Sequence, residues 1–222
     1  MRESTTRFTA KWRSVLRWGL RLAALIVVVI AGLVMADSLH KRQCRGAASH
    51  KGESYELMGE RLTFLNTGRE TNGEVLEIDV SFKPTAETNI LKWKDAHVHP
   101  YREERFKVIS GSVRFRIGDR EQILTPGQSV SGPPNIPHTW NSADGEEIHM
   151  LAELRPALHT DAAAASFMHA SSTQGKMSLL QAAVIMSEFD GLAYPTKTRS
   201  MLMQGLVKVL APIGRLFGYE AC

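Results

Sequence analysis

Cysteine is scarce in this chain of 222 residues, which contains only Cys44 and Cys222. A disulfide-stabilised scaffold and a thiolate zinc site both need several cysteines at short spacings, so neither is expected here. Cys44 follows Arg42 and Gln43, which lack the small and apolar character expected before a lipidated cysteine. The sequence therefore also disfavours a lipoprotein.

The net positive charge is small, and aromatic residues are few. Lysine and arginine exceed the acidic residues by four, 27 against 23, and aromatic residues make up 7% of the chain. Much of the basic excess lies in the first fifty residues, and no stretch interleaves basic with aromatic side chains as a base-stacking platform requires. We therefore expect no nucleic-acid partner.

A single long run lacks charge, LAALIVVVIAGLVMA from Leu22 to Ala36, and Trp18 to Leu20 extend its apolar character beyond Arg21. A spanning helix needs about 20 apolar residues, and a long side chain such as Arg21 can reach the headgroups. We predict a basic N-terminal segment at residues 1–17 and a transmembrane helix or signal anchor at residues 18–39.

More basic residues precede the run than follow it, which favours a cytoplasmic N-terminus and a folded domain on the outer side of the membrane. Two alternatives stay open. A cleavable signal peptide could end at Val34-Met35-Ala36, so that the domain is exported. A later start, at Met35 or Met58, would instead give a cytoplasmic protein.

Residues 40–53 are small and charged, which predicts a linker, and residues 54–158 show the alternation of a β-barrel. A strand is expected from Glu74 to Phe82, where every second residue from Leu76 onward is apolar. This alternation predicts that one face of the strand is buried. Short strands separated by turn signals favour an antiparallel barrel. Further strands are expected at Glu104–Ile109, Ser112–Ile117, Gln122–Leu124, His138–Asn141 and Glu147–Leu154.

Residues 159–222 predict a helical extension, with helices at Asp161–His169, Ser178–Phe189 and Met201–Phe217. The last helix has a broad apolar stripe and is interrupted at Pro212. We expect this stripe to pack on the barrel or on a second subunit, which makes a homodimer a further prediction.

Four polar residues have the spacing of a metal site. His97 and His99 lie two apart, so an extended strand directs both side chains to one face. In the next strand, Glu104 shares its face with Phe106, whereas Glu103 lies on the other face. A carboxylate among apolar side chains is costly without a cation, and His138 begins another strand. We predict one divalent ion (Fe, Mn, Ni, Cu, Zn or Co) on His97, His99, Glu104 and His138.

The run HVHPYREERFKVISG, from His97 to Gly111, resembles the first sequence motif of the cupin family, and GQSVSGPPNIPHTWN, from Gly127 to Asn141, resembles the second. The second motif departs where Asn135 replaces the usual glycine, and Asn141 comes one residue early. The flanks resemble small bacterial single-domain cupins similar to quercetin dioxygenases. The resemblance implies an all-β cupin barrel, a double-stranded β-helix or jelly roll, with a bound metal ion.

Three functions are compatible with these features. The first is a metal-dependent dioxygenase acting on a small oxygenated organic compound, with Glu104 as a possible base as well as a ligand. The second is a non-enzymatic, metal-stabilised module that binds or senses a small molecule. The third is a sugar isomerase or epimerase, for which the sequence shows no phosphate-binding cluster. Side chains expected near the cavity or its mouth are Tyr101, Trp140, His149 and Glu153.

Overall fold

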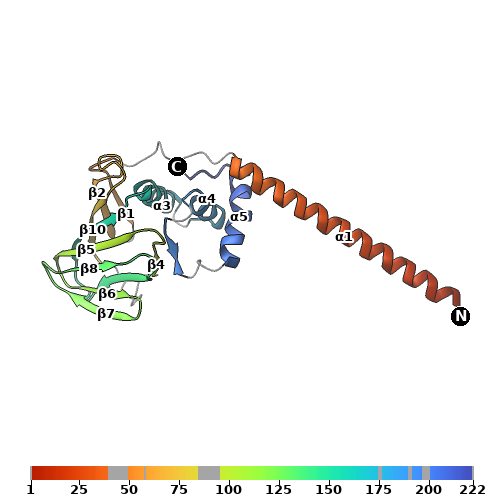
Figure 1. The fold of residues 1–222 in the computed structure, drawn as a ribbon, viewed down its shortest axis with the longest axis horizontal. Coiled ribbons are helices and arrows are strands. Elements are labelled where there is room, and N and C mark those ends of the chain that lie inside the picture. Colours follow the sequence, from red (N-terminus) through yellow and green to blue (C-terminus); the bar gives the residue numbers. More distant parts are fainter. Residues whose placement is uncertain are drawn as a thin grey trace. The chain divides into compact units, whose positions relative to one another are not determined.

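The computed structural model describes residues 2–39, 50–57, 59–84, 96–174, 177–189, 192–196 and 201–221. Its internal contacts divide the chain into two compact units, Met1–Lys41 and Arg42–Cys222. Most of the first unit is helix α1, Arg2–Leu39 (Figure 1). Each unit is described by itself below.

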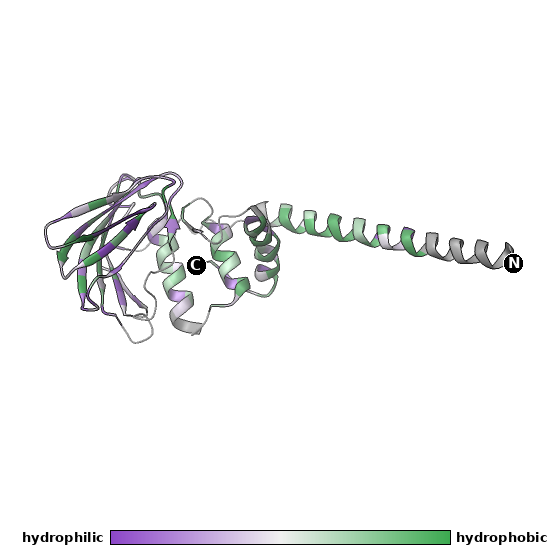
Figure 2. Cartoon of the chain, turned by 90° about the horizontal axis from the view of Figure 1, so that it is seen from below, coloured by the Kyte–Doolittle hydropathy of each residue, from purple (hydrophilic) through white to green (hydrophobic). Residues whose placement is uncertain are grey.

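Helix α1 contains a largely apolar stretch of 22 residues, Val15–Ala36 (Figure 2). None of these residues is buried. By length and composition this stretch could be a membrane span or a signal sequence. It begins three residues before the segment predicted from the sequence. The stretch contains two charged residues, Arg17 and Arg21, and the guanidinium of Arg21 lies 5.7 Å from the centre of the Trp18 ring, so this charge contacts an aromatic face.

The second unit contains two antiparallel sheets. The first has the strand order β1-β2-β3-β10-β5-β8 and the second has the order β11-β4-β9-β6-β7. The strands of the first sheet are Ser54–Leu57, Glu60–Asn66, Leu76–Phe82, Ile148–Arg155, Glu103–Ser110 and Ser129–Gly132, in that order. Those of the second are Tyr194–Pro195, His97–Val98, His138–Ser142, Val113–Ile117 and Arg120–Leu124.

The core lies between the sheets, because strict alternation directs one set of side chains inward. Along β3, Leu76, Ile78, Val80 and Phe82 are buried while the residues between them are partly exposed. The ring of Phe82 meets that of Trp140 edge to face, with centres 5.7 Å apart. Burying each such side chain contributes roughly 1.5–3 kcal/mol, so the repeated inward face stabilises the barrel.

Three helices follow the last long strand: α3, Thr160–Gln174; α4, Leu179–Glu188; and α5, Met201–Leu216. Ser178 caps α4, since its hydroxyl oxygen accepts from the Gln181 amide at 3.1 Å. Helix α5 packs closely on α4 at Gly214, where a β-carbon would come within 2.7 Å of Val184. The helices therefore join the barrel in one compact unit.

The predicted jelly roll with C-terminal helices and an N-terminal apolar helix is confirmed. Asn135 has φ +64°, the left-handed conformation for which glycine is usual, and its side chain donates to the Pro100 carbonyl at 3.0 Å. No strand was predicted at β1, β2, β8 or β11. Strands β1, β8 and β11 have two to four residues and are too short for a visible alternation, whereas β2 has seven residues, of which only Phe64 is fully buried.

Candidate metal centre

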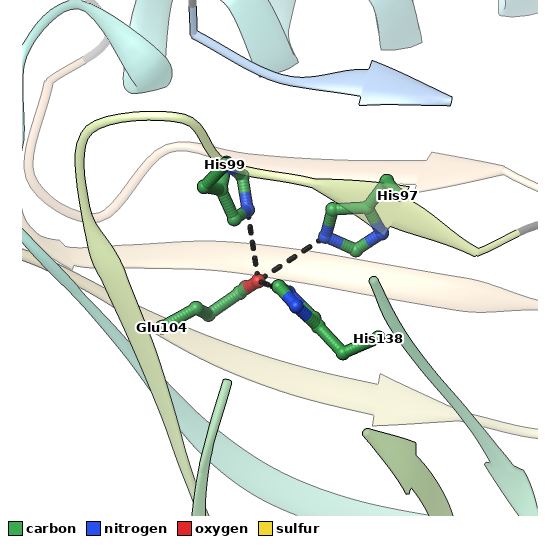
Figure 3. Close-up of side chains that lie close together, drawn as sticks. All are labelled: His97, His99, Glu104 and His138. Atoms are coloured by element: carbon green, nitrogen blue, oxygen red, sulfur yellow. Dashed lines mark hydrogen bonds and ion pairs between the residues drawn. The ribbon is translucent and has the colours of Figure 1, made fainter. Parts of the chain in front are cut away.

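Four side chains contributed by both sheets meet at one place inside the barrel (Figure 3). His97 lies on β4, His99 directly follows this strand, Glu104 lies on β5 and His138 begins β9. Antiparallel pairing places His97 opposite His138. On β5, Glu104, Phe106 and Val108 are buried and Glu103 is exposed, so the predicted parity of this strand is confirmed.

The geometry is centred on one carboxylate oxygen. Oε2 of Glu104 lies 3.2 Å from Nε2 of His97, 3.0 Å from Nε2 of His99 and 2.9 Å from Nε2 of His138. The four candidate ligand atoms all lie within 4.8 Å of one another. Side-chain exposure is 31% for His97, but 11% for Glu104, 4% for His99 and 1% for His138. Solvent or a ligand therefore reaches the group from the His97 side.

The four groups shift one another's pKa. Burial alone would raise the pKa of Glu104, but hydrogen bonds with His138, His97 and His99 outweigh it and hold that pKa well below its usual range. Burial lowers the pKa of His97. For His138, burial also opposes protonation, but the contact with Glu104 prevails and raises the pKa. A buried, ionised carboxylate in this place attracts a cation or protons.

Backbone carbonyls orient two of the imidazoles. Nδ1 of His99 lies 2.9 Å from the Leu192 carbonyl, and Nδ1 of His138 lies 2.9 Å from the Ile136 carbonyl. A carbonyl only accepts, so we assign the proton of each ring to Nδ1. Nε2 of both rings then faces the Glu104 carboxylate: with a proton it donates to Glu104, and without one its lone pair is available to a cation. This arrangement of the second ring nitrogen is typical of histidines that bind metals.

These residues fit a divalent ion. Lone pairs and a carboxylate about 3 Å apart repel one another unless a cation, or a proton on each imidazole, lies between them. Two adjacent ligands about 2.1 Å from an octahedral ion are about 3.0 Å apart, which agrees with the contacts of Glu104. Three imidazoles and one carboxylate leave further positions open on such an ion. The group could therefore hold a metal ion.

Arg102 ties this group to the C-terminal region, a role that the sequence did not indicate. Its side chain is 1% exposed and donates to the carbonyls of Ala157 and Leu192 and to the hydroxyl of Thr160. Burial lowers the pKa of Arg102 to about 10. Nε also lies 3.3 Å from Nδ1 of His99, but Nδ1 cannot both accept there and donate to Leu192. Leu192 thus accepts from Arg102 and from His99.

A cavity of about 450 Å³ opens beside the candidate metal centre. His97, His99 and Glu104 form part of its wall, while strands of the barrel and helices α3 and α4 supply most of the rest. Of the four side chains expected near a cavity, Trp140 lines it, whereas Tyr101, His149 and Glu153 are not among its lining residues. His149 instead lies 2.7 Å from the carboxylate of Asp79 on the neighbouring strand.

Residues 82–152 match the family model of the Cupin domain. No curated protein matches the chain. Among solved structures, an RmlC-like cupin from Shewanella frigidimarina has 18% identity, with 50% of this chain and 88% of that chain covered and a TM-score of 0.41.

Two further structures have similar scores. KdgF from Halomonas sp. has 14% identity, 49% and 89% coverage and a TM-score of 0.40. Streptomyces PAC13 with uridine has 14% identity, 49% and 78% coverage and a TM-score of 0.38. The family match includes His97, His99, Glu104 and His138, so residues 82–152 of this chain form a domain of the cupin superfamily.

Proposed function

We propose that this chain binds one divalent transition metal ion on His97, His99, Glu104 and His138 and acts as a metal-dependent dioxygenase on a small oxygenated organic compound. The observation that supports it best is the convergence of three Nε2 atoms on one carboxylate oxygen at the wall of a cavity. Fe, Mn, Ni, Cu, Zn and Co all suit these ligands.

When bound, a redox-active ion supplies the electron transfer that reactions between O2 and organic molecules require. The chain's own residues position the substrate. His97, His99 and Glu104 form a polar cluster in the cavity wall, Glu60 adds a further carboxylate, and the largely apolar remainder limits water around the bound molecule. Because its pKa is held so low, Glu104 is a weak base, so we propose it as a ligand first and a proton acceptor second.

A non-enzymatic binding or sensing module is the second candidate. It is favoured by the limited acid–base chemistry of the cavity. Among the described lining residues, the acidic and basic side chains are His97, His99, Glu104 and Glu60. A metal-bound ligand could be held and released there without conversion, with metal binding stabilising the fold.

Metal analysis of the full chain, purified without a histidine tag, tests the proposal. We expect near-stoichiometric metal in the wild type, little in His97→Ala and a wild-type amount in Glu103→Ala. Thermal stability should fall in parallel with metal content. Fe, Mn, Ni or Cu would favour dioxygenase activity, to be tested next by O2 consumption, whereas Zn would favour the binding module. Failure to bind any of these ions, even when they are added, would contradict both.

For localisation, we propose a single-pass membrane protein with the barrel on the outer side. The exposed apolar stretch Val15–Ala36 and the preceding basic residues support this proposal. Export after signal cleavage and a cytoplasmic product of a later start are the alternatives. A homodimer also stays a prediction, and we propose α5 as its interface. Large apolar side chains are exposed on this helix or directly after it, namely Leu202, Leu206, Leu216 and Phe217.

A further inference from the structure

Most side chains that line the cavity are apolar, and its polar ones include a cluster of three. This cluster is His97, His99 and Glu104, which lie together in the cavity wall. Barrel side chains such as Ile78 and Val80 form one apolar wall. Helices α3 and α4 form another, which includes Phe167, Ile185, Met186 and Phe189. The two helices lie outside residues 82–152, so this wall is not part of the matched cupin domain.

The apolar walls offer no partner for a charged ligand. The described residues that line the cavity include no lysine or arginine, and its carboxylates are Glu60 and Glu104. Thr160 adds a hydroxyl, but this group already donates to the Ala157 carbonyl at 2.7 Å and accepts from Arg102. A phosphate, a carboxylate or a ring with many hydroxyls would lose water here without gaining matching hydrogen bonds, which is unfavourable.

We propose that the cavity binds an uncharged, largely apolar organic molecule with one oxygen-bearing group directed at His97, His99 and Glu104, and that α3 and α4 determine which molecules fit. This inference rests on the proposed function, because the oxygen-bearing group would bind the metal ion. A volume of about 450 Å³ accommodates an aromatic ring with substituents or a short branched chain. Sugar phosphates and polyhydroxylated compounds are poor ligands on this basis.

Three hydroxamic acids with the same metal-binding group test the proposal. They are acetohydroxamic acid, benzohydroxamic acid and 4-carboxybenzohydroxamic acid. The full chain is loaded with Co(II) in protein-scaffold lipid nanodiscs, because detergent would compete for an apolar cavity. The visible spectrum of Co(II) reports coordination, and empty nanodiscs correct for probe that enters the lipid. We expect benzohydroxamic acid to bind about ten-fold or more tightly than acetohydroxamic acid, from burial of its ring.

The charged probe separates this inference from the proposed function. 4-Carboxybenzohydroxamic acid should bind no more tightly than acetohydroxamic acid, because its carboxylate would lie unpaired among apolar side chains. Two outcomes would leave the metal function standing but contradict the apolar site. In the first, acetohydroxamic acid binds and the two aromatic probes bind with equal affinity. In the second, acetohydroxamic acid binds and neither aromatic probe binds more tightly than it does. If Co(II) does not load or no probe alters its spectrum, the proposed function fails, and this inference with it.

A variant on α3 tests the role of the helices. Phe167 lines the cavity and is 47% exposed, so it lies where a cation can be introduced without being fully buried. We expect Phe167→Lys to strengthen binding of 4-carboxybenzohydroxamic acid by about five-fold and to weaken that of benzohydroxamic acid. Ile123→Lys is the matched control, since Ile123 on β7 is 54% exposed and does not line the cavity. If folded, Co(II)-loaded Phe167→Lys binds the two aromatic probes with the same ratio of affinities as the wild type, α3 does not determine which molecules fit.

Discussion

At the scale of single residues, Gly132 lies against one candidate metal ligand and opposite another. It pairs with Glu104 across strands β8 and β5. A β-carbon at position 132 would come within 2.7 Å of Nδ1 of His138 and 2.9 Å of its Cγ. Glycine is therefore required here by the close approach of an imidazole ring, although the backbone itself is not in the left-handed region.

We expect Gly132→Ala to displace the His138 ring and to weaken metal binding by about ten-fold or more. The free energy of unfolding should fall by roughly 1–3 kcal/mol, because the added methyl group overpacks a buried site. Titration with Co(II) and urea denaturation measure the two effects.

Gly205→Ala is the matched control for this substitution. Gly205 lies within α5, and a β-carbon there meets nothing within 4 Å. Alanine in a helix is favoured over glycine by roughly 0.5–1 kcal/mol, so this variant should be slightly more stable and bind metal normally. Equal metal binding by both variants would show that His138 does not need its present position.

At the scale of elements, a C-terminal segment reinforces the short strand that contains His97. Strand β4 has only two residues and is flanked by β9 on one side and β11 on the other. Tyr194 pairs with Val98, and the Thr196 amide donates to the Ala96 carbonyl at 2.9 Å. Just before β11, the Leu192 carbonyl accepts from Arg102 and His99. The extension therefore supports the candidate ligands His97, on β4, and His99, directly after it.

Arg102→Met tests this support, because methionine keeps much of the side-chain volume but donates no hydrogen bond. The carbonyls of Ala157 and Leu192 would lose a buried donor, and we expect the free energy of unfolding to fall by about 2–4 kcal/mol. Metal affinity should also fall, since Leu192 orients His99. Arg155→Met is the control, because the Arg155 side chain is 58% exposed. Normal metal affinity in Arg102→Met would mean that the ligands are positioned without it.

At the scale of the whole molecule, the two units have different apolar surfaces. The second unit buries its apolar strand faces in a core, whereas Val15–Ala36 in the first unit has no buried residue. An apolar helix of 22 residues exposed to water is unfavourable, and insertion into a bilayer removes that cost. Membrane attachment is thus proposed for α1 and not required for the barrel.

Removal of residues 1–41 is expected to release the protein from the membrane. The full chain should stay in the membrane fraction after alkaline carbonate extraction, and the remaining Arg42–Cys222 unit should be soluble with an unchanged metal content. A protease added outside intact cells then tests the orientation of the full chain. If the barrel lies on the outer side of the membrane, the protease should digest it. A full chain that carbonate extracts completely would contradict the anchor and favour signal cleavage or a later start.

The sequence by itself determined the barrel and the four candidate ligands. Strand periodicity is local, so the two-residue spacing of His97 and His99 and the inward parity of Glu104 can be read without knowledge of the fold. The turn residues, and the replacement of glycine by Asn135 at a left-handed position, are equally local.

Only the tertiary structure decided what surrounds these ligands. Arg102 and Leu192 are ninety residues apart, and β11 has only two residues, so no local pattern indicates that they meet at His99. The cavity likewise forms only where α3 and α4 pack beside the barrel, which places Phe167 and Ile185 near the candidate metal centre. Periodicity tells which face of an element is apolar, but the partner of that face is set by packing between distant segments.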